Sequence, residues 1–205
     1  MPETNALRTF IAIELDAGLR RELQRIQEGF KRQMPPGSVR WVAPEGIHLT
    51  LKFLGDTPRG RVAEVGAALE RACAGCAPFE FSLEGRGCFP NLRRPRVIWV
   101  AVRERGQALA HLNAAVEREV APLGWPTEER AFSPHLTLGR VTRDADGRAE
   151  TAIGGIVERS VIEQIGVQLA TAVHLIQSDL RPSGAVYTRL LSVPLSAAAA
   201  AEKGE

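Results

Sequence analysis

The stretch His48-Leu49-Thr50-Leu51 recurs, residue for residue, 87 positions later as His135-Leu136-Thr137-Leu138. The same shift lays Phe10-Ile11-Ala12-Ile13 over Val97-Ile98-Trp99-Val100, two short apolar runs that we expect to be buried strands. Each run is followed by a helical pattern and, 38 residues after its start, by the histidine motif. The repeat therefore predicts two similar strand–helix–strand lobes that face each other about a pseudo-twofold axis.

The spacing within each motif indicates chemistry. Alternation along a strand places histidine and threonine on one face and the two leucines on the other, so the leucines can anchor the strand in a core. Imidazole titrates near neutral pH, so one histidine can accept a proton while the other donates one. Threonine hydroxyls suit the nonbridging oxygens of a phosphate. We therefore predict phosphoryl chemistry in a shared cleft, with His48 and His135 as catalytic residues and Thr50 and Thr137 as phosphate-binding residues.

We expect no metal ion and no cofactor. No carboxylate lies within either motif and no His-x-His occurs. Cys73 and Cys76 form a C-x-x-C, but a zinc site would need a second pair of ligands. They fall in a predicted helix, where this spacing shares one face, so we interpret them as small buried residues. A P-loop for a bound nucleotide is also missing from the sequence.

The composition is that of an ordinary soluble globular protein, with 44% apolar and 24% charged residues in 205. No apolar run approaches the roughly 18–20 residues that span a bilayer, and no secretion signal is visible, so we expect a cytoplasmic protein without membrane contact. A formal net charge of +2 is too small to predict nonspecific DNA binding. We expect one domain over residues 1–205, frayed at 1–7 and 197–205, that acts as a monomer.

Apolar periodicity predicts further elements around the repeat. Helices are expected over about 16–34, 60–76 and 109–120, and a closing pair of strands over 172–180 and 185–193. The segment 143–160 is ambiguous, because Gly154-Gly155 interrupts a possible helix.

The paired motifs resemble those of the two-histidine (2H) phosphoesterase superfamily. Three flanking stretches are similar to the bacterial and archaeal RNA 2′,3′-cyclic phosphodiesterases, also called 2′-5′ RNA ligases: Arg40-Trp41-Val42, Pro44-Glu45 and Phe53-Leu54-Gly55. The likeness covers about residues 8–191. It implies an α+β fold of two similar lobes related by a pseudo-twofold axis, each with an antiparallel sheet and flanking helices, around a central cleft.

The resemblance also implies an activity and its residues. The reaction is metal-independent hydrolysis of the 2′,3′-cyclic phosphate at RNA 3′ ends to a 2′-phosphomonoester, with reversible 2′-5′ joining as a second activity. His135 would activate water and His48 would protonate the departing 3′-oxygen. Arg140 matches a substrate-binding arginine; strict alternation would point it away from His135, so the strand must bend first. Phe89 falls where relatives can place an aromatic ring near the nucleobase.

Other interpretations stay open at this point. A 2H phosphodiesterase acting on small cyclic nucleotides or ADP-ribose cyclic phosphate would share the chemistry, and a noncatalytic RNA-binding protein could keep the cleft. Arg140 can be an ordinary surface arginine and Phe89 a core residue. Lys52 shares the His48 face by parity, where it either adds positive potential or is solvated at the rim.

Overall fold

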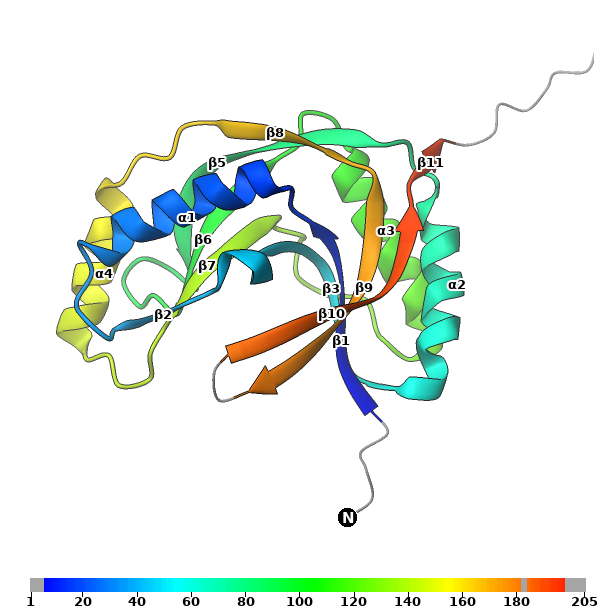
Figure 1. Ribbon diagram of the computed structural model, residues 1–205, viewed down its shortest axis with the longest axis horizontal. Coiled ribbons are helices and arrows are strands. Elements are labelled where there is room, and N and C mark those ends of the chain that lie inside the picture. The colour runs from blue at the N-terminus through cyan, green and yellow to red at the C-terminus, as the bar shows by residue number, and fades with distance from the viewer. Residues whose placement is uncertain (1–5, 182–183, 198–205) are drawn as a thin grey trace, which may run out of the picture.

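The computed structural model describes residues 6–181 and 184–197. Its two main sheets have strand orders β10-β9-β1-β3 (sheet A) and β2-β7-β6-β5-β8 (sheet B), and every neighbouring pair in them is antiparallel (Figure 1). The strands of sheet A are β1 Ala6–Glu14, β3 His48–Pro58, β9 Ala172–Arg181 and β10 Gly184–Pro194. Those of sheet B are β2 Val39–Trp41, β5 Phe79–Phe89, β6 Val97–Arg103, β7 His135–Val141 and β8 Ile165–Ala170. A short parallel pair is formed by β4 Ala74–Gly75 and β11 Ser196–Ala197.

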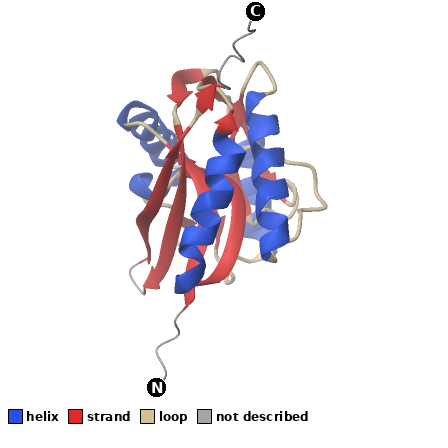
Figure 2. Cartoon of the chain, turned by 90° about the vertical axis from the view of Figure 1, so that its right-hand side faces the viewer, coloured by secondary structure: helices blue, strands red, loops and turns tan. Residues whose placement is uncertain are grey.

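Within the described residues, four helices cover the sheets, two on each. They are α1 Ala17–Lys31, α2 Val62–Cys73, α3 Ala108–Val120 and α4 Gly147–Arg159, with short 3-10 turns η1 Pro44–Gly46, η2 Arg59–Arg61 and η3 Ala121–Leu123. Helices α2 and α3 lie side by side on sheet A (Figure 2), whereas α1 and α4 lie on sheet B. The predicted α+β fold of two lobes is therefore confirmed.

The two lobes exchange their helices. Helix α1 follows β1 of sheet A along the chain but packs on sheet B, and α3 follows β6 of sheet B but packs on sheet A. A shift of 87 residues lays β1 on β6, α1 on α3 and β3 on β7, as the repeat in the sequence predicted. It also lays α2 on α4, which the sequence had left ambiguous. The histidine motifs open strands β3 and β7, and their leucines are buried in one core shared by both sheets.

Local differences from the expected elements have physical reasons. Helix α4 continues through Gly154-Gly155. Gly154 serves close packing against the loop between β5 and β6, because a Cβ there would stand 1.9 Å from the carbonyl oxygen of Leu92. Strand β1 begins at Ala6 and includes the buried Leu7, so the expected frayed end at 1–7 is wrong for these two residues. Ala197 likewise belongs to β11. The rest of both expected tails, 1–5 and 198–205, lies outside the described residues.

Candidate active site

Strand β3 carries a β-bulge within its histidine motif. Its pairing with β1 changes register between Thr50 and Lys52, which makes Leu51 the additional residue. A bulge reverses the alternation of side chains beyond it, and Lys52 consequently points into the interior. Lys52 is only 4% exposed, and its ammonium bonds the carboxylate of Glu117 at 2.6 Å. The prediction that Lys52 shares the face of His48 was therefore wrong.

Strand β7 carries the equivalent bulge. Its pairing with β6 changes register between Thr137 and Gly139, so Leu138 is the additional residue. Here the reversal brings the exposed Arg140 onto the face of His135 and Thr137. The strand does bend before Arg140, as the sequence required for a substrate contact.

Buried amides from two helices hold the bulges in place. Gln27 of α1 donates from Nε2 to the carbonyl of Leu138 at 2.8 Å, and Asn113 of α3 donates from Nδ2 to the carbonyl of Leu51 at 2.9 Å. The carbonyl of Leu138 also accepts from the backbone N–H of Val42 at 2.9 Å. Val42 lies shortly before β3. This bond therefore connects the segment that leads to the His48 motif with β7, the strand that carries the His135 motif. Strands β3 and β7 are thus neighbours although they belong to different sheets.

A backbone carbonyl fixes the tautomer of His135. Nδ1 lies 2.8 Å from the carbonyl oxygen of Ser133, and a carbonyl can only accept. Nδ1 therefore carries the proton, and Nε2 of the neutral ring is left with a lone pair that can accept one. Phe89 stands edge-on to the imidazole at a centroid distance of 4.8 Å, and Trp99 lies at 6.4 Å.

His48 lies among aromatic rings on sheet A. Its imidazole stacks on Phe10 at 4.4 Å and meets Tyr187 edge-on at 5.2 Å. Burial lowers the pKa of His48 to about 4, although interactions with the backbone of Gly46 and the charge of Glu14 act in the opposite direction. His48 in the free protein is therefore neutral at pH 7.

A pocket of about 180 Å³ lies beside His48. Its other lining residues are Glu14, Arg20, Glu45, Ile47, Ile176, Tyr187 and Arg189. Sequence analysis did not assign any of these to the site. The signals that could have found them are weak: Glu14 is the acidic end of an apolar strand, and Tyr187 lies in the closing strand, far along the chain.

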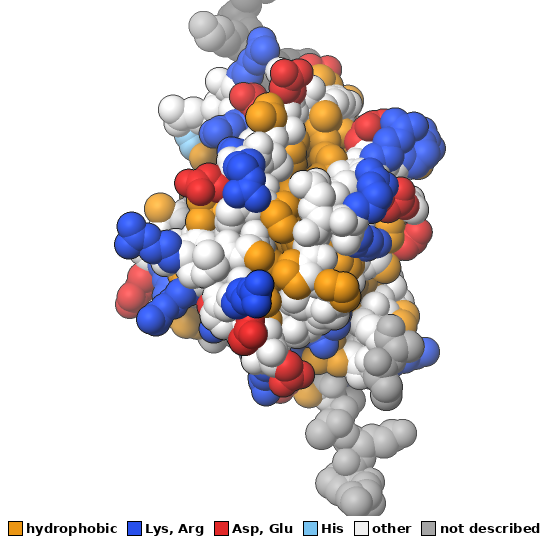
Figure 3. Space-filling model, turned by 90° about the vertical axis from the view of Figure 1, so that its left-hand side faces the viewer, with side chains coloured by type: hydrophobic (Ala, Val, Ile, Leu, Met, Phe, Trp, Pro, Cys, Tyr) orange, Lys and Arg blue, Asp and Glu red, His pale blue; other side chains and the backbone are white. Residues whose placement is uncertain are grey.

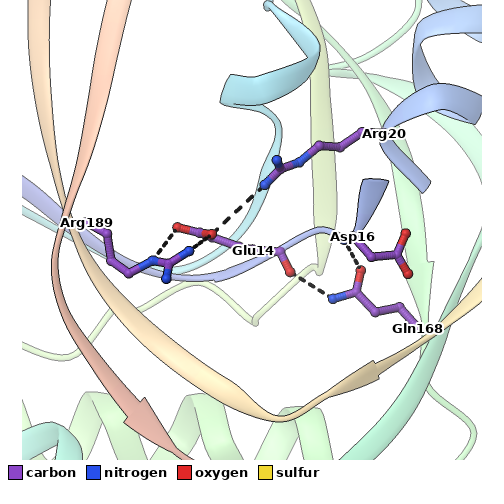
Figure 4. Close-up of polar contacts among 5 residues, drawn as sticks. All are labelled: Glu14, Asp16, Arg20, Gln168 and Arg189. Atoms are coloured by element: carbon purple, nitrogen blue, oxygen red, sulfur yellow. Dashed lines mark hydrogen bonds and ion pairs between the residues drawn. The ribbon is translucent and has the colours of Figure 1, made fainter. Parts of the chain in front are cut away.

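Glu14 is the centre of a polar network in this pocket (Figure 4). Arg189 donates to both carboxylate oxygens, from Nε at 3.0 Å and from Nη2, while a guanidinium nitrogen of Arg20 lies at 4.0 Å. The hydrogen bond from Arg189 is the main reason that the pKa of Glu14 is lowered. Gln168 of β8 donates to the carbonyl of Glu14 at 2.8 Å and accepts from the N–H of Asp16 at 2.9 Å, which ties the end of β1 to sheet B.

The two motif threonines are positioned for a ligand. Each threonine lies two residues after its histidine, and the pairing with the neighbouring strand stays in register between them. Each hydroxyl therefore shares the face of its histidine. Both side chains are half-buried, and neither hydroxyl has a hydrogen-bond partner within the described parts of the chain.

The remaining sequence expectations concern metals, cysteines and membranes. Across residues 6–181 and 184–197, no group of three or more His, Cys, Asp or Glu side chains is placed to hold a metal ion. Cys73 is buried, and burial raises its pKa to about 12, in agreement with its interpretation as a small buried residue. Cys76 is only half-buried and lies beyond the end of α2, so the expectation that the two cysteines share one helix face was wrong. No helix in the described ranges is both long and apolar enough to cross a membrane.

Comparison with known proteins identifies the family. Residues 13–99 match the family model described as LigT like Phosphoesterase. The chain is 37% identical over 184 residues to the RNA 2′,3′-cyclic phosphodiesterase of Methanothermobacter thermautotrophicus. This match covers 89% of this chain and 95% of the relative. The protein of the same name from Archaeoglobus fulgidus is 33% identical, over 90% and 98% of the two chains. The chain belongs to the LigT-like 2H phosphoesterase family.

Solved structures extend the likeness to the whole LigT-like fold. TT0787 of Thermus thermophilus superposes with a TM-score of 0.74 at 27% identity, over 92% of this chain and 98% of that one. E. coli LigT, in a crystal structure complexed with 3′-AMP, gives 0.72 at 25% identity, over 93% and 99%. The family resemblance predicted from the two motifs is confirmed.

Proposed function

We propose that this chain is an RNA 2′,3′-cyclic phosphodiesterase that opens the cyclic phosphate at RNA 3′ ends to a 2′-phosphomonoester. Its second activity is reversible 2′-5′ joining, in which an RNA 5′-hydroxyl takes the place of water and O3′ again leaves. The observation that carries the proposal is the fixed tautomer of His135, whose Nε2 is free to accept a proton on the face of Thr137. The family relatives that bear this name support the choice of substrate.

The chemistry follows from two imidazoles on opposite sides of a phosphate. Nε2 of His135 takes a proton from water as the water oxygen bonds to phosphorus, the bond from phosphorus to O3′ breaks, and His48 gives a proton to O3′. Thr50 and Thr137 donate hydrogen bonds to the nonbridging oxygens, which carry most of the charge in the transition state. His48 becomes protonated once the phosphate anion is bound beside it, because a neighbouring negative charge raises the pKa of an imidazole.

The test is the cleavage of a short RNA that ends in a 2′,3′-cyclic phosphate, with EDTA present and with 2′- and 3′-phosphate products resolved. We expect 2′-phosphate only. His48→Ala and His135→Ala should each lower the rate about 100-fold or more. His111→Ala is the matched control, because His111 is exposed on α3 outside the cleft, and it should leave the rate unchanged.

Four results would contradict the proposal. A 3′-phosphate product would mean that the other ester bond breaks, and activity lost in EDTA but restored by a divalent cation would mean that a metal is required. A folded protein that leaves the RNA intact but opens cyclic mononucleotides or ADP-ribose cyclic phosphate would keep the two histidines and change the substrate. Inactivity on all of these would favour a noncatalytic RNA-binding protein.

A further inference from the structure

A row of four neighbouring side chains crosses the cleft face of sheet B. Phe89 pairs with Val97, Val97 pairs with Arg140, and Arg140 pairs with Arg40. Directly paired residues project from the same face, with Cβ atoms about 4.5–5.5 Å apart. Because Phe89 lies against His135, the row leads from the catalytic ring outward to two adjacent arginines.

Arg40 and Arg140 are like charges placed opposite each other. Both are exposed, and neither makes an ion pair or a side-chain hydrogen bond to any residue in the described ranges. The nearby Arg96, in contrast, is paired with Glu150 at 2.7 Å. Two like charges directly opposite on a sheet repel each other, and an anion bound between them would relieve this repulsion. The guanidinium group binds phosphate oxygens through two parallel hydrogen bonds, which makes a phosphate the fitting anion.

The arginine pair is separate from the reacting phosphate. Arg140 is three residues along β7 from Thr137, roughly 10 Å of strand, so a phosphate between the guanidinium groups would be a second one on the same ligand. Figure 3 looks onto the side of the molecule at the left of Figure 1, and shows apolar side chains down the middle of this face, with Lys and Arg intermixed with Asp and Glu on both sides. A chain of nucleotides could lie along such a surface, with bases on apolar groups and phosphates on basic ones.

The two halves of the cleft differ at this position. The residue of β3 that corresponds to Arg140 is Phe53, which is 61% exposed and apolar. The pair of arginines is therefore found beside the His135 motif, and the corresponding strand of the His48 motif has no arginine at the equivalent position. A difference of this kind would give a bound RNA strand one direction.

We propose that Arg40, together with Arg140, binds a second phosphate of the substrate: the phosphodiester on the 5′ side of the terminal nucleotide. This inference rests on the proposed function, because it assigns the rest of the RNA chain to a site beside the reacting end. Its consequence is a preference for oligonucleotide ends over mononucleotides. Arg40 lies in a stretch that resembles the family, but the resemblance assigned it no role.

The experiment compares two substrates in parallel. One is the dinucleotide adenylyl-adenosine ending in a 2′,3′-cyclic phosphate, and the other is adenosine 2′,3′-cyclic phosphate. The wild type should prefer the dinucleotide. Arg40→Gln should lower kcat/KM for the dinucleotide about tenfold, mainly through KM, and change that for the mononucleotide by less than about twofold. Arg40→Lys should keep part of the preference, because it keeps the charge but not the paired hydrogen bonds.

Arg105→Gln is the matched control. Arg105 is exposed and follows the end of β6 opposite to Val97, so the variant loses the same charge at the far end of the strand and should behave as the wild type. The proposal fails if Arg40→Gln affects both substrates equally or neither, or if its effect falls on ADP-ribose cyclic phosphate instead, which would make the second phosphate a diphosphate. If the folded wild type cleaves neither adenosine substrate, the proposed function itself is wrong.

Discussion

Replacing Lys52 by methionine would remove the positive member of a buried ion pair while nearly keeping the volume of the side chain. The ammonium of Lys52 bonds Glu117 at 2.6 Å and the carbonyl of Pro126 at 2.8 Å, and the two charged side chains are 2% and 8% exposed. The carboxylate of Glu117 keeps one other partner, the N–H of Glu128 at 3.2 Å. A buried carboxylate that loses its cation costs about 3–5 kcal/mol, and we expect a loss of unfolding free energy in this range.

The assay is urea denaturation followed by tryptophan fluorescence and circular dichroism. Lys31→Met is the control, because Lys31 is exposed at the end of α1 and its loss should cost no more than about 1 kcal/mol. The double variant Lys52→Met/Glu117→Leu should recover most of the stability, since both charges leave the interior together. The reasoning is refuted if Lys52→Met costs less than about 1 kcal/mol, or if the double variant is less stable than either single one.

Further predictions concern the site and the packing. Thr137→Ala should lower kcat/KM about tenfold or more with unchanged Tm, because one charge-assisted hydrogen bond is lost; an unaltered kcat/KM would remove Thr137 from the phosphate site. Burial lowers the pKa of His48 from about 6.5 to about 4, so the unfolded chain binds the extra proton and stability should fall by up to about 3 kcal/mol as pH drops from 6.5 to 4. In urea titrations His48→Gln should flatten this dependence, and an equally steep curve would contradict the cause. Gly154→Ala should cost about 1–3 kcal/mol in thermal unfolding because of the carbonyl of Leu92, whereas Gly155→Ala should be mild, since its Cβ meets a flexible side chain; similar effects at both positions would count against the close approach.

The repeated motif was enough to predict the two-lobe fold and the faces of the motif residues. Period-two alternation placed the histidines, the threonines and the leucines correctly, because these residues precede or open the bulges. It failed at Lys52, one residue beyond a bulge, since a bulge depends on the pairing of two strands and leaves no mark in the alternation of one. The corresponding bulge in β7 supplied the bend that a substrate contact by Arg140 required.

The pocket beside His48 was beyond the reach of sequence reasoning. Glu14 and Arg189 are 175 residues apart, and they meet only because β9 and β10 return to the sheet that β1 began. Strand β8 was not predicted either. Two of its apolar residues, Val167 and Leu169, are more than half exposed, so these apolar side chains do not face the core as alternation along a half-buried strand would require. Contacts of this kind depend on topology, and no local pattern encodes them.

The exchange of helices between the lobes determines when this protein can fold during its synthesis. Helix α1 leaves the ribosome long before β5, β6 and β7, which are strands of the sheet that it covers. Strand β1 is synthesised more than 150 residues before β9, the strand that pairs with it. The amino-terminal half alone therefore has neither a completed sheet nor a covered one. We expect the nascent chain to remain without stable tertiary structure until β10 has emerged, and then both lobes, and with them both histidines, to reach their places in one cooperative step.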